Sequence, residues 1–319
     1  MKTDKQIINE ATAFLPDALR FPFSNIGEKY LCDIKEIRLK RNYPVCVVTS
    51  NKKLFLKFDG ELVCDAEQSG LCKVENIYMD EAVRRLCNYS IHAFQNQMKN
   101  GFITISGGHR VGISATAITN AEGCITAIKN VSSLNIRIAR EVPGAANELI
   151  SEVFNDNKIK SVLIVGEPSS GKTTVLRDVA RRLSGKEFGY MRVCVVDERG
   201  EISATNDGIS QKTLDVGCDI LDGYPKSEGM MIALRTMAPE VIICDEIGGF
   251  EDISAIENIA NAGIRLIATI HSDSFLHLSK RVQFSKLMQT SAFDVAVVLC
   301  GKNNPGKIKD IIPLRRYWR

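Results

Sequence analysis

The stretch with the most specific chemistry is VLIVGEPSSGKTTVLRDVA, residues 162–180. Four residues have the spacing Gly-x-x-x-x-Gly-Lys-Ser/Thr of a phosphate-binding loop: Gly166, Gly171, Lys172 and Thr173. In such a loop consecutive backbone N–H groups surround phosphate oxygens, and glycine lets the backbone approach them closely. The stretch therefore predicts a nucleoside triphosphate site, rather than a Gly-Ser turn with an incidental lysine.

Two adjacent carboxylates form the second candidate feature. Asp245 and Glu246 follow the apolar run Val241–Cys244. The first carboxylate suits Mg²⁺, which Thr173 also contacts in this class of site, and the second can position and polarise an attacking water. Phosphoryl transfer depends on alignment and charge neutralisation more than on covalent help, so Lys172, Mg²⁺ and Glu246 would supply most of the chemistry. The alternative is a pair of surface carboxylates in ion pairs.

Further polar residues follow two other apolar runs. VCVVDERGE places Asp197, Glu198 and Arg199 at the end of one run. The two carboxylates are consistent with orienting water, with joining a magnesium network, or with pairing structurally to the arginine. LIATIHSD places Thr269 and His271 at the end of the other run. An imidazole there can sense the γ-phosphate and signal its presence to the next subunit, although a lone histidine is commonly structural.

A cation from another subunit can complete such a site. One P-loop domain often lacks a positive charge for the transition state, and a neighbouring subunit supplies it as an arginine finger. Five arginines are candidates: Arg38, Arg110, Arg137, Arg140 and Arg235. For each of them an ordinary surface role is the alternative.

These side chains need elements that bring them together. The run Val162–Val165 has no polar alternation, which is typical of a parallel strand covered on both faces. The P-loop then leads into an amphipathic helix, and strands and helices alternate from there, which predicts a mostly parallel sheet. Because open α/β sheets bind ligands at the carboxyl ends of their strands, the polar residues are expected to converge on the phosphate site.

The first half of the chain has a different pattern. It predicts a helix over residues 5–20, a helix over 79–97, and several short strands separated by turn residues. The predicted strands include Glu36–Leu39, Val45–Thr49, Leu54–Phe58, two strands around Gly107-Gly108, and NIRIARE. Pro143-Gly144 marks the expected boundary. We therefore predict a smaller α+β N-terminal domain over residues 1–143 and an α/β, RecA-like P-loop NTPase domain over 144–319.

Composition limits the class of protein. The chain has 319 residues, 45% of them hydrophobic and 25% charged, as in ordinary globular proteins. Its 41 basic and 38 acidic residues give a net charge of +3, which does not select nucleic acid as a partner. Ten cysteines stand singly and are expected to be reduced thiols. With no signal-peptide core and no run of membrane-spanning length, the sequence predicts a cytosolic protein that meets a membrane through partners.

Four successive elements resemble the secretion ATPase superfamily, the hexameric motors of type II and type IV secretion and pilus systems. The matching segments are a Walker A loop at Gly166–Thr173, an acidic box at Val195–Arg199, a Walker B segment at ALRTMAPEVIICDEIGG, and a histidine box at ATIHSD. Many of these motors have glycine before the catalytic glutamate, where this chain has Asp245. That departure supports the magnesium assignment and argues against a pilus motor.

A closer resemblance covers nearly the whole chain. The segment TLDVGCDILDGYPKSEGMM, with GFITISGGHRVGI, SLNIRIAREVPGAA and EIRLKRNYP, is similar to the stage III sporulation protein AA family. The resemblance implies an ATPase of endospore-forming bacteria that acts as a ring, expected to be a hexamer. It would work in the mother-cell cytoplasm, on membrane proteins at the base of a trans-envelope channel complex between mother cell and forespore.

The resemblance also implies roles for individual residues, with ATP and Mg²⁺ as cofactors. Nucleotide binding falls on nine residues: Gly166, Glu167, Pro168, Ser169, Ser170, Gly171, Lys172, Thr173 and Thr174. Catalysis falls on Glu246 with Lys172 and Glu198, and magnesium support on Thr173 and Asp245, partly through water. Arg235 and His271 are assigned to coupling between subunits.

Two other functions remain open from the sequence. A nucleic-acid-binding ATPase is suggested by the basic cluster Arg177–Lys186, but no platform of interleaved aromatic and basic residues accompanies it, so nucleic acid is an unlikely partner. A slow assembly scaffold, in which ATP closes a ring and hydrolysis resets it, would carry the same motifs as a motor.

Overall fold

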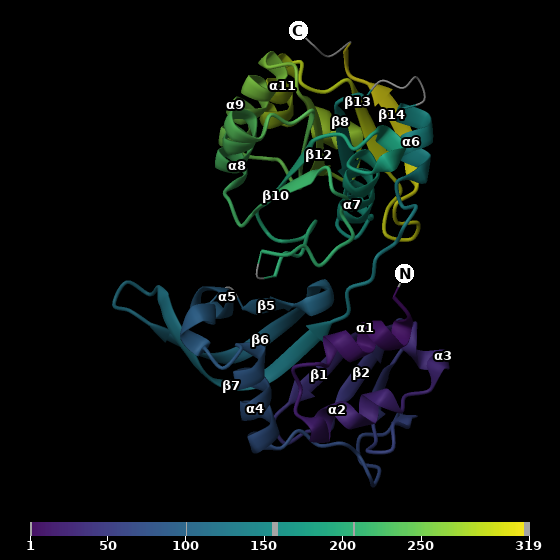
Figure 1. Ribbon diagram of the computed structural model, residues 1–319, viewed down its shortest axis with the longest axis vertical. Coiled ribbons are helices and arrows are strands. Elements are labelled where there is room, and N and C mark those ends of the chain that lie inside the picture. The colour runs from purple at the N-terminus through teal and green to yellow at the C-terminus, as the bar shows by residue number, and fades with distance from the viewer. Residues whose placement is uncertain (1, 100, 155–158, 207, 316–319) are drawn as a thin grey trace. The chain divides into compact units, whose positions relative to one another are not determined.

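The computed structural model describes residues 2–99, 101–154, 159–206 and 208–315. The chain divides into two compact units, Met1–Arg140 and Glu141–Arg319, drawn in Figure 1 from purple to blue and from teal to yellow. Each unit contains one seven-stranded sheet. The division falls a few residues before Pro143-Gly144.

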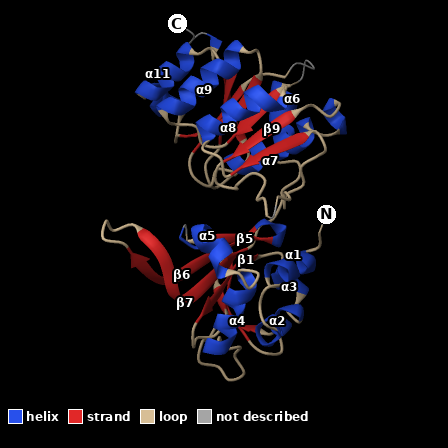
Figure 2. Cartoon of the chain, turned by 60° about the vertical axis from the view of Figure 1, so that its left-hand side comes forward, coloured by secondary structure: helices blue, strands red, loops and turns tan. Residues whose placement is uncertain are grey.

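The first unit is built on an antiparallel sheet with strand order β4-β3-β2-β1-β7-β6-β5. Its strands are β1 (Ile34–Lys40), β2 (Cys46–Thr49), β3 (Lys53–Leu56), β4 (Leu62–Val63), β5 (Phe102–Ile105), β6 (His109–Thr119) and β7 (Ile125–Arg137). Its helices are α1 (Asp4–Ala11), α2 (Asp17–Ser24), α3 (Glu28–Leu31), α4 (Asn76–Leu86) and α5 (Gln95–Lys99), with short 3₁₀ segments at Ile91–Phe94 and Ser106–Gly108. The ends of β6 and β7 extend past the helices as a two-stranded ribbon (Figure 2).

The two long helices predicted in this unit are wrong in their extent. The first breaks because Pro16, with φ −62° and ψ 151°, precedes α2 in an extended conformation that a continuous helix does not allow. The second ends at Leu86, because Asn88 and Tyr89 have φ of 47° and 58°, outside the right-handed helical region. Apolar spacing alone did not reveal either break.

The two faces of this sheet differ in character. Alternate residues such as Ile37, Val111 and Ile136 are buried in the core beneath the helices. Their neighbours along the strands, Arg38 and Arg137, are exposed on the other face. This alternation leaves one polar face on the sheet.

The second unit is a doubly covered sheet with strand order β10-β9-β11-β12-β8-β13-β14. Its strands are β8 (Val162–Gly166), β9 (Val193–Asp197), β10 (Cys218–Asp222), β11 (Val241–Cys244), β12 (Arg265–His271), β13 (Val295–Leu299) and β14 (Ile308–Pro313). Pairings among β8 to β13 are parallel, and β14 is antiparallel to β13. The predicted mostly parallel α/β sheet is confirmed, although β10 and β14 were not expected.

Helices cover both faces of this sheet, as Figure 1 shows. They are α6 (Asn147–Val153), α7 (Lys172–Leu183), α8 (Lys226–Ile232), α9 (Phe250–Asn261), α10 (Phe275–Ser279) and α11 (Val282–Gln289), with a 3₁₀ segment at Lys186–Phe188 and a π-helical segment at Ala233–Met237. Leu163 and Val165 of β8 pack in one core with α8, α9 and α11, while Val162 and Ile164 pack in the other with α6 and α7. This explains why the strand before the P-loop is apolar without alternation.

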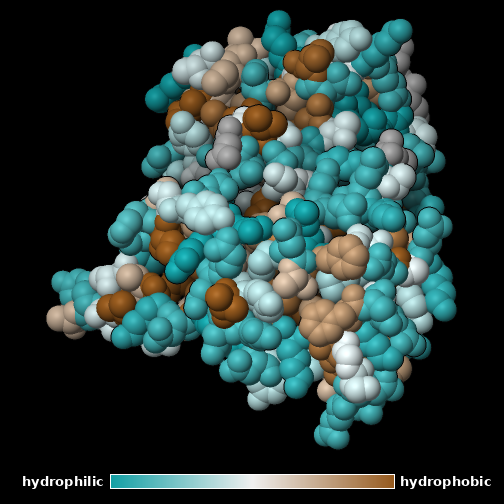
Figure 3. Space-filling model, turned by 60° about the horizontal axis from the view of Figure 1, so that its bottom comes forward, coloured by the Kyte–Doolittle hydropathy of each residue, from teal (hydrophilic) through white to brown (hydrophobic). Residues whose placement is uncertain are grey.

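The surface is largely polar on the face drawn in Figure 3, where hydrophobic side chains stand in small separate groups. In the described part of the chain, none of the helices has both the length and the apolar character that crossing a bilayer requires.

Candidate active site

The phosphate-binding loop connects the end of β8 to the start of α7. Ser169 and Gly171 have φ of 63° and 91°, so the loop turns through left-handed conformations. A Cβ on Gly171 would lie 2.6 Å from the backbone nitrogen of Gly306, and a Cβ on Gly166 would collide with the hydroxyl of Ser170. Gly171 is therefore required both by its left-handed conformation and by the close approach of the Gly306 backbone, and Gly166 by the close approach of the Ser170 hydroxyl.

Lys172 begins α7 and is 6% exposed. Its Nζ donates to the carbonyl oxygen of Glu167 at 3.0 Å, across the loop. Burial lowers the pKa of Lys172 below 10.5, against the opposing effect of Asp245 and Glu246. The helix N-terminus and this buried cation both favour an anion at the loop.

Ser170 provides a test of whether a phosphate fits the loop. The residue is fully buried, and its hydroxyl is one of the buried polar groups that lack a hydrogen-bond partner within the described chain. Buried hydroxyls are nearly always paired, so this one is suited to a partner that the protein itself does not supply. Its carbonyl is occupied, since it accepts from the backbone N–H of Gly306 at 2.8 Å. The loop thus fits a bound phosphate group.

Asp245 joins the loop to the end of β11. The hydroxyl of Thr173 donates to Asp245 Oδ2 at 2.6 Å, and the hydroxyl of the fully buried Thr269 donates to Oδ1. A threonine hydroxyl and a carboxylate on adjacent elements are the oxygen ligands that Mg²⁺ takes beside a nucleotide. The donor set therefore fits Mg²⁺ at the position predicted from the sequence.

Glu246 is held by its backbone in a left-handed conformation with φ of 49°. Its N–H donates to the hydroxyl of Thr269 at 2.8 Å and to Asp245 Oδ1 at 3.0 Å. Its exposed carboxylate accepts from Arg199 Nη1 at 2.9 Å. The side chain of Glu246 thus lies at the edge of the site, where it forms an ion pair with Arg199 of the acidic box.

The two carboxylates of the acidic box, Asp197 and Glu198, lie in different surroundings. Asp197 is buried and accepts three backbone N–H groups, from Glu201 at 2.8 Å, Ile202 at 3.1 Å and Ser203 at 2.8 Å. Asp197 therefore holds the loop after β9 through backbone hydrogen bonds, a role that was not among those considered from the sequence. Glu198 remains beside the site, with its Oε2 at 3.4 Å from Lys226 Nζ.

One pocket brings the acidic box together with the carboxylate pair. Its lining residues are Asp197, Glu198, Arg199, Glu201, Lys226, Asp245 and Glu246. A second pocket is lined by Thr174 together with Val142 and Pro143. Thr174, at the end of the predicted nucleotide-binding segment, therefore lines a different pocket from the carboxylate pair.

The two residues assigned to coupling lie in different places. His271 ends β12 and is paired in register with Gly166, so it is exposed on the strand next to the P-loop. Arg235 is exposed in the π-helical segment and is not among the residues that line the charged pocket. The structure thus brings His271, but not Arg235, to the rim of the site within this chain.

The arginine-finger candidates of the first unit also lie in two different places. Arg110 and Arg137 are cross-strand partners on β6 and β7, and Arg38 of β1 lies on the same polar face of the sheet. Arg140 instead donates to the carbonyl oxygens of Ile34 and Leu31, each at 2.6 Å. Arg140 is therefore engaged in holding the first unit together.

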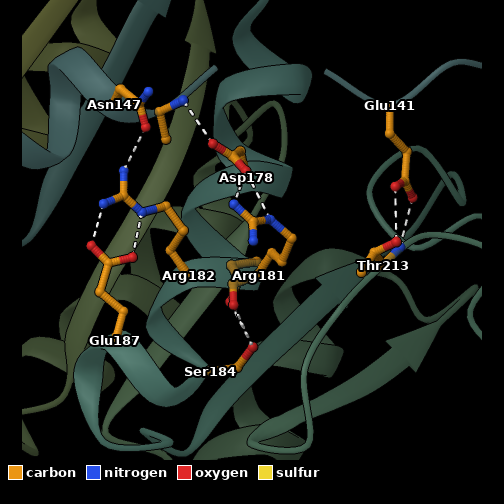
Figure 4. Close-up of polar contacts among 10 residues, drawn as sticks. Glu141, Asn147, Asp178, Arg181, Arg182, Ser184, Glu187 and Thr213 are labelled. Carbon is orange, nitrogen blue, oxygen red and sulfur yellow. Dashed lines mark hydrogen bonds and ion pairs between the residues drawn. The ribbon is translucent and has the colours of Figure 1, made fainter. Parts of the chain in front are cut away.

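The basic cluster after the P-loop is used inside the second unit. Arg177 donates to the carbonyl of Ile202 at 2.8 Å, and burial lowers its pKa. Figure 4 shows Arg181 turned to Asp178 and Arg182 turned to Glu187, each forming an ion pair. The three arginines of this cluster are therefore engaged in contacts within the second unit.

The segment that enters the second unit is tied to the same helix. Asp178 accepts from the backbone N–H of Ala146 at 3.0 Å, and the carboxylate of Glu141 accepts from the N–H and hydroxyl of Thr213 (Figure 4). The chain is thus anchored on both α7 and a loop of the second unit before the sheet begins.

Three parts of the site were not assigned roles from the sequence. Thr269 bridges Asp245 and Glu246, Lys226 reaches the carbonyl of Glu246, and Gly306 contacts the P-loop from the turn between β13 and β14. Two of them could have been found from the sequence: Thr269 lies at the end of an apolar run, and Lys226 lies in the family-specific segment. For the contact of Gly306 the sequence offers no signal beyond the residues of a turn.

A parallel sheet with a P-loop after β8 and carboxylates after β9 and β11 defines a RecA-like P-loop fold. Solved structures agree with this class. The ATPase DotB of Legionella pneumophila has a TM-score of 0.51 at 13% identity, with 92% of this chain and 74% of that chain covered. The pilus retraction motor PilT with bound ADP has a TM-score of 0.53 at 12% identity, covering 83% and 74%. At these identities the likeness concerns the fold.

The family follows from sequence comparison. Residues 10–316 match the family described as sporulation stage III, protein AA. Stage III sporulation protein AA of Bacillus subtilis (strain 168) is 35% identical over 306 residues, which cover 95% of this chain and 94% of that protein. The uncharacterized protein ycf45 of Cyanidium caldarium is 32% identical over 165 residues, 50% of this chain and 46% of that protein. The chain belongs to the sporulation stage III protein AA family.

Proposed function

We propose that this protein is a Mg²⁺-dependent ATPase that forms a ring, expected to be hexameric, and powers or assembles a trans-envelope complex between mother cell and forespore during sporulation. The observation that carries the proposal is the hydrogen bond from Thr173 to Asp245. It joins the phosphate-binding loop to the carboxylate pair, so one site can hold a triphosphate, a metal ion and a hydrolytic water. Family membership supports the sporulation setting, and the mother-cell side is part of the proposal.

The protein's own residues divide the chemistry among them. The P-loop N–H groups, Ser170 and Lys172 would bind the phosphates, and Lys172 would exchange its bond to the Glu167 carbonyl for phosphate oxygens. Thr173 and Asp245 would hold Mg²⁺, whose charge offsets the negative charge of the phosphates. Glu246 would orient the attacking water once its carboxylate leaves Arg199.

We also propose that a neighbouring subunit supplies a cation that completes the site. The arginines on the polar face of the first unit, Arg38, Arg110 and Arg137, are the candidates for that role, together with Arg235. His271, on the strand next to the P-loop, is the candidate for sensing the γ-phosphate. Assembly should therefore raise the turnover of each chain.

The test is ATP turnover of the purified chain at several protein concentrations, with and without Mg²⁺. Glu246→Gln should lower turnover by at least about a hundredfold while leaving the binding of a non-hydrolysable ATP analogue intact. Glu257→Gln is the matched control, because Glu257 is exposed on α9 and away from the pocket. Specific activity should rise with concentration.

Two results would count against the proposal, and a third would decide between powering and assembling. Turnover that survives Glu246→Gln removes that residue from its role. A specific activity that stays flat down to dilute monomer argues against assembly in a ring. Turnover that is too slow to drive movement, with assembly that still needs ATP, would favour the scaffold over the motor.

A further inference from the structure

Lys226 is a charged residue in an unfavourable local position. It is the first residue of α8, where the helix dipole disfavours a cation, and its side chain is only 12% exposed. A lysine that is both nearly buried and badly placed for helix stability requires partners that compensate for the lost hydration. Those partners lie in the charged pocket.

The partners of Lys226 lie just after the ends of two different strands, β9 and β11. Its Nζ donates to the backbone carbonyl of Glu246 at 2.7 Å, and it lies 3.4 Å from Oε2 of Glu198. The carbonyl is the closer of the two and has ideal hydrogen-bond length, whereas the carboxylate is at the distance of a loose ion pair. The lysine is therefore directed at the backbone of Glu246.

That backbone needs support. Glu246 has φ of 49°, and a residue with a side chain is less stable in this left-handed region than in the right-handed one. Its N–H is held by Thr269 and its carbonyl by Lys226, so the two sides of the residue are fixed by different elements. The conformation of Glu246 decides where its carboxylate points.

Close packing fixes the position of the lysine in turn. Gly229, one turn further along α8, lets the helix approach β9: a Cβ there would lie 2.5 Å from Val196 Cγ1. The helix therefore lies directly against the strand that ends in the acidic box. This sets the start of α8 within reach of the end of β11.

We propose that Lys226 is a positioning residue for hydrolysis: it holds the left-handed backbone of Glu246, and so aims the carboxylate, without binding the nucleotide. This inference rests on the proposed function and adds a residue to it. It gives α8 a part in the site, with Lys226 acting through Glu246. Displacing a reacting group by about 1 Å can cost about a hundredfold in rate, which sets the size of the expected effect.

The experiment compares Lys226→Met with the wild-type chain in steady-state ATP turnover and in binding of a non-hydrolysable ATP analogue. We expect kcat to fall by between about tenfold and a hundredfold, with KM and analogue affinity unchanged. Lys309→Met is the control, since Lys309 is exposed on the edge strand β14. Lys226→Gln, which is too short to reach the carbonyl, is a second variant with the same expectation if the methionine variant folds poorly.

A double-variant test separates this role from a general one. In a Glu246→Gln background, Lys226→Met should cause no further loss of the residual turnover, because the group that it positions is gone. An unchanged kcat in Lys226→Met, an equal loss in both backgrounds, or weaker analogue binding would each overturn the inference while leaving Glu246 in place. A wild-type chain that hydrolyses no ATP would overturn the proposed function and this inference together.

Discussion

Replacing Thr269 with valine removes the hydroxyl that bridges the Asp245 carboxylate and the backbone N–H of Glu246. Valine keeps the shape of threonine but lacks the hydroxyl, which in the structure donates to Asp245 and accepts from the N–H of Glu246. Thr269 is fully buried, so water does not replace the lost partner at that point. The substitution therefore removes two hydrogen bonds and creates little empty volume.

The expected loss of unfolding free energy depends on the hydrogen bonds that Asp245 and Glu246 keep in the variant. Asp245 keeps its bond from Thr173, and the Glu246 N–H keeps its bond to Asp245. A lost hydrogen bond to a charged group costs about 1.5–3 kcal/mol, and partial compensation brings the expected loss of unfolding free energy to about 2 kcal/mol. For a unit of this size, that lowers the melting temperature by about 4–8 °C. Turnover should fall about tenfold, because Glu246 loses one of its anchors.

Calorimetry or circular dichroism of the full chain measures the melting transition, and ATP turnover is measured alongside. Thr236→Val is the control, since Thr236 is exposed and its hydroxyl bonds only within its own helix, to the carbonyl of Ile232. Thr269→Ser, which restores the hydroxyl, should recover most of the turnover. A Thr269→Val protein with the melting temperature and turnover of the wild type would refute the bridging role.

Two further predictions concern the P-loop. The pKa of Lys172 lies below 10.5, so its protonated form is lost as pH rises through that lowered value, and affinity for a fluorescent ATP analogue should weaken before pH 10.5. Lys172→Arg, which stays protonated, should remove this pH dependence. An arginine variant with the same pH profile as the wild type would contradict the prediction. Gly306→Ala and the control Gly189→Ala both place a side chain at positive φ, 82° and 70°, at a cost of about 1–2 kcal/mol each. Analogue binding should weaken several-fold in Gly306→Ala alone, and equal affinities would show that the contact with Ser170 is dispensable.

The sequence was most informative where chemistry constrains several residues at once. Unalternating apolar runs predicted the strands of the parallel sheet, and the carboxyl-end rule predicted that Asp245 would meet the P-loop, as the hydrogen bond from Thr173 shows. The roles of the predicted catalytic residues stay predictions. Strand β10 was not recognised because its edge position allows two exposed aspartates, Asp219 and Asp222, to interrupt a short apolar run.

The remaining parts depend on tertiary contacts that no local pattern encodes. Arg140 and Arg177 looked like surface cations, yet each binds backbone carbonyls of segments distant in the chain. The pairing of Lys226 with the Glu246 carbonyl depends on the left-handed backbone at Glu246, and residue type alone gives no indication of that conformation. Such contacts are visible only once the fold is known.

The anchored entry into the second unit has a mechanical consequence. Ala146 is bonded to helix α7 and Glu141 to the loop bearing Thr213, so the segment that begins the second unit is held at two points. If phosphate binding displaces α7, Ala146 would be displaced with it, because its N–H is bonded to Asp178 of that helix. The first residues of the second unit would then respond to the state of the phosphate-binding loop.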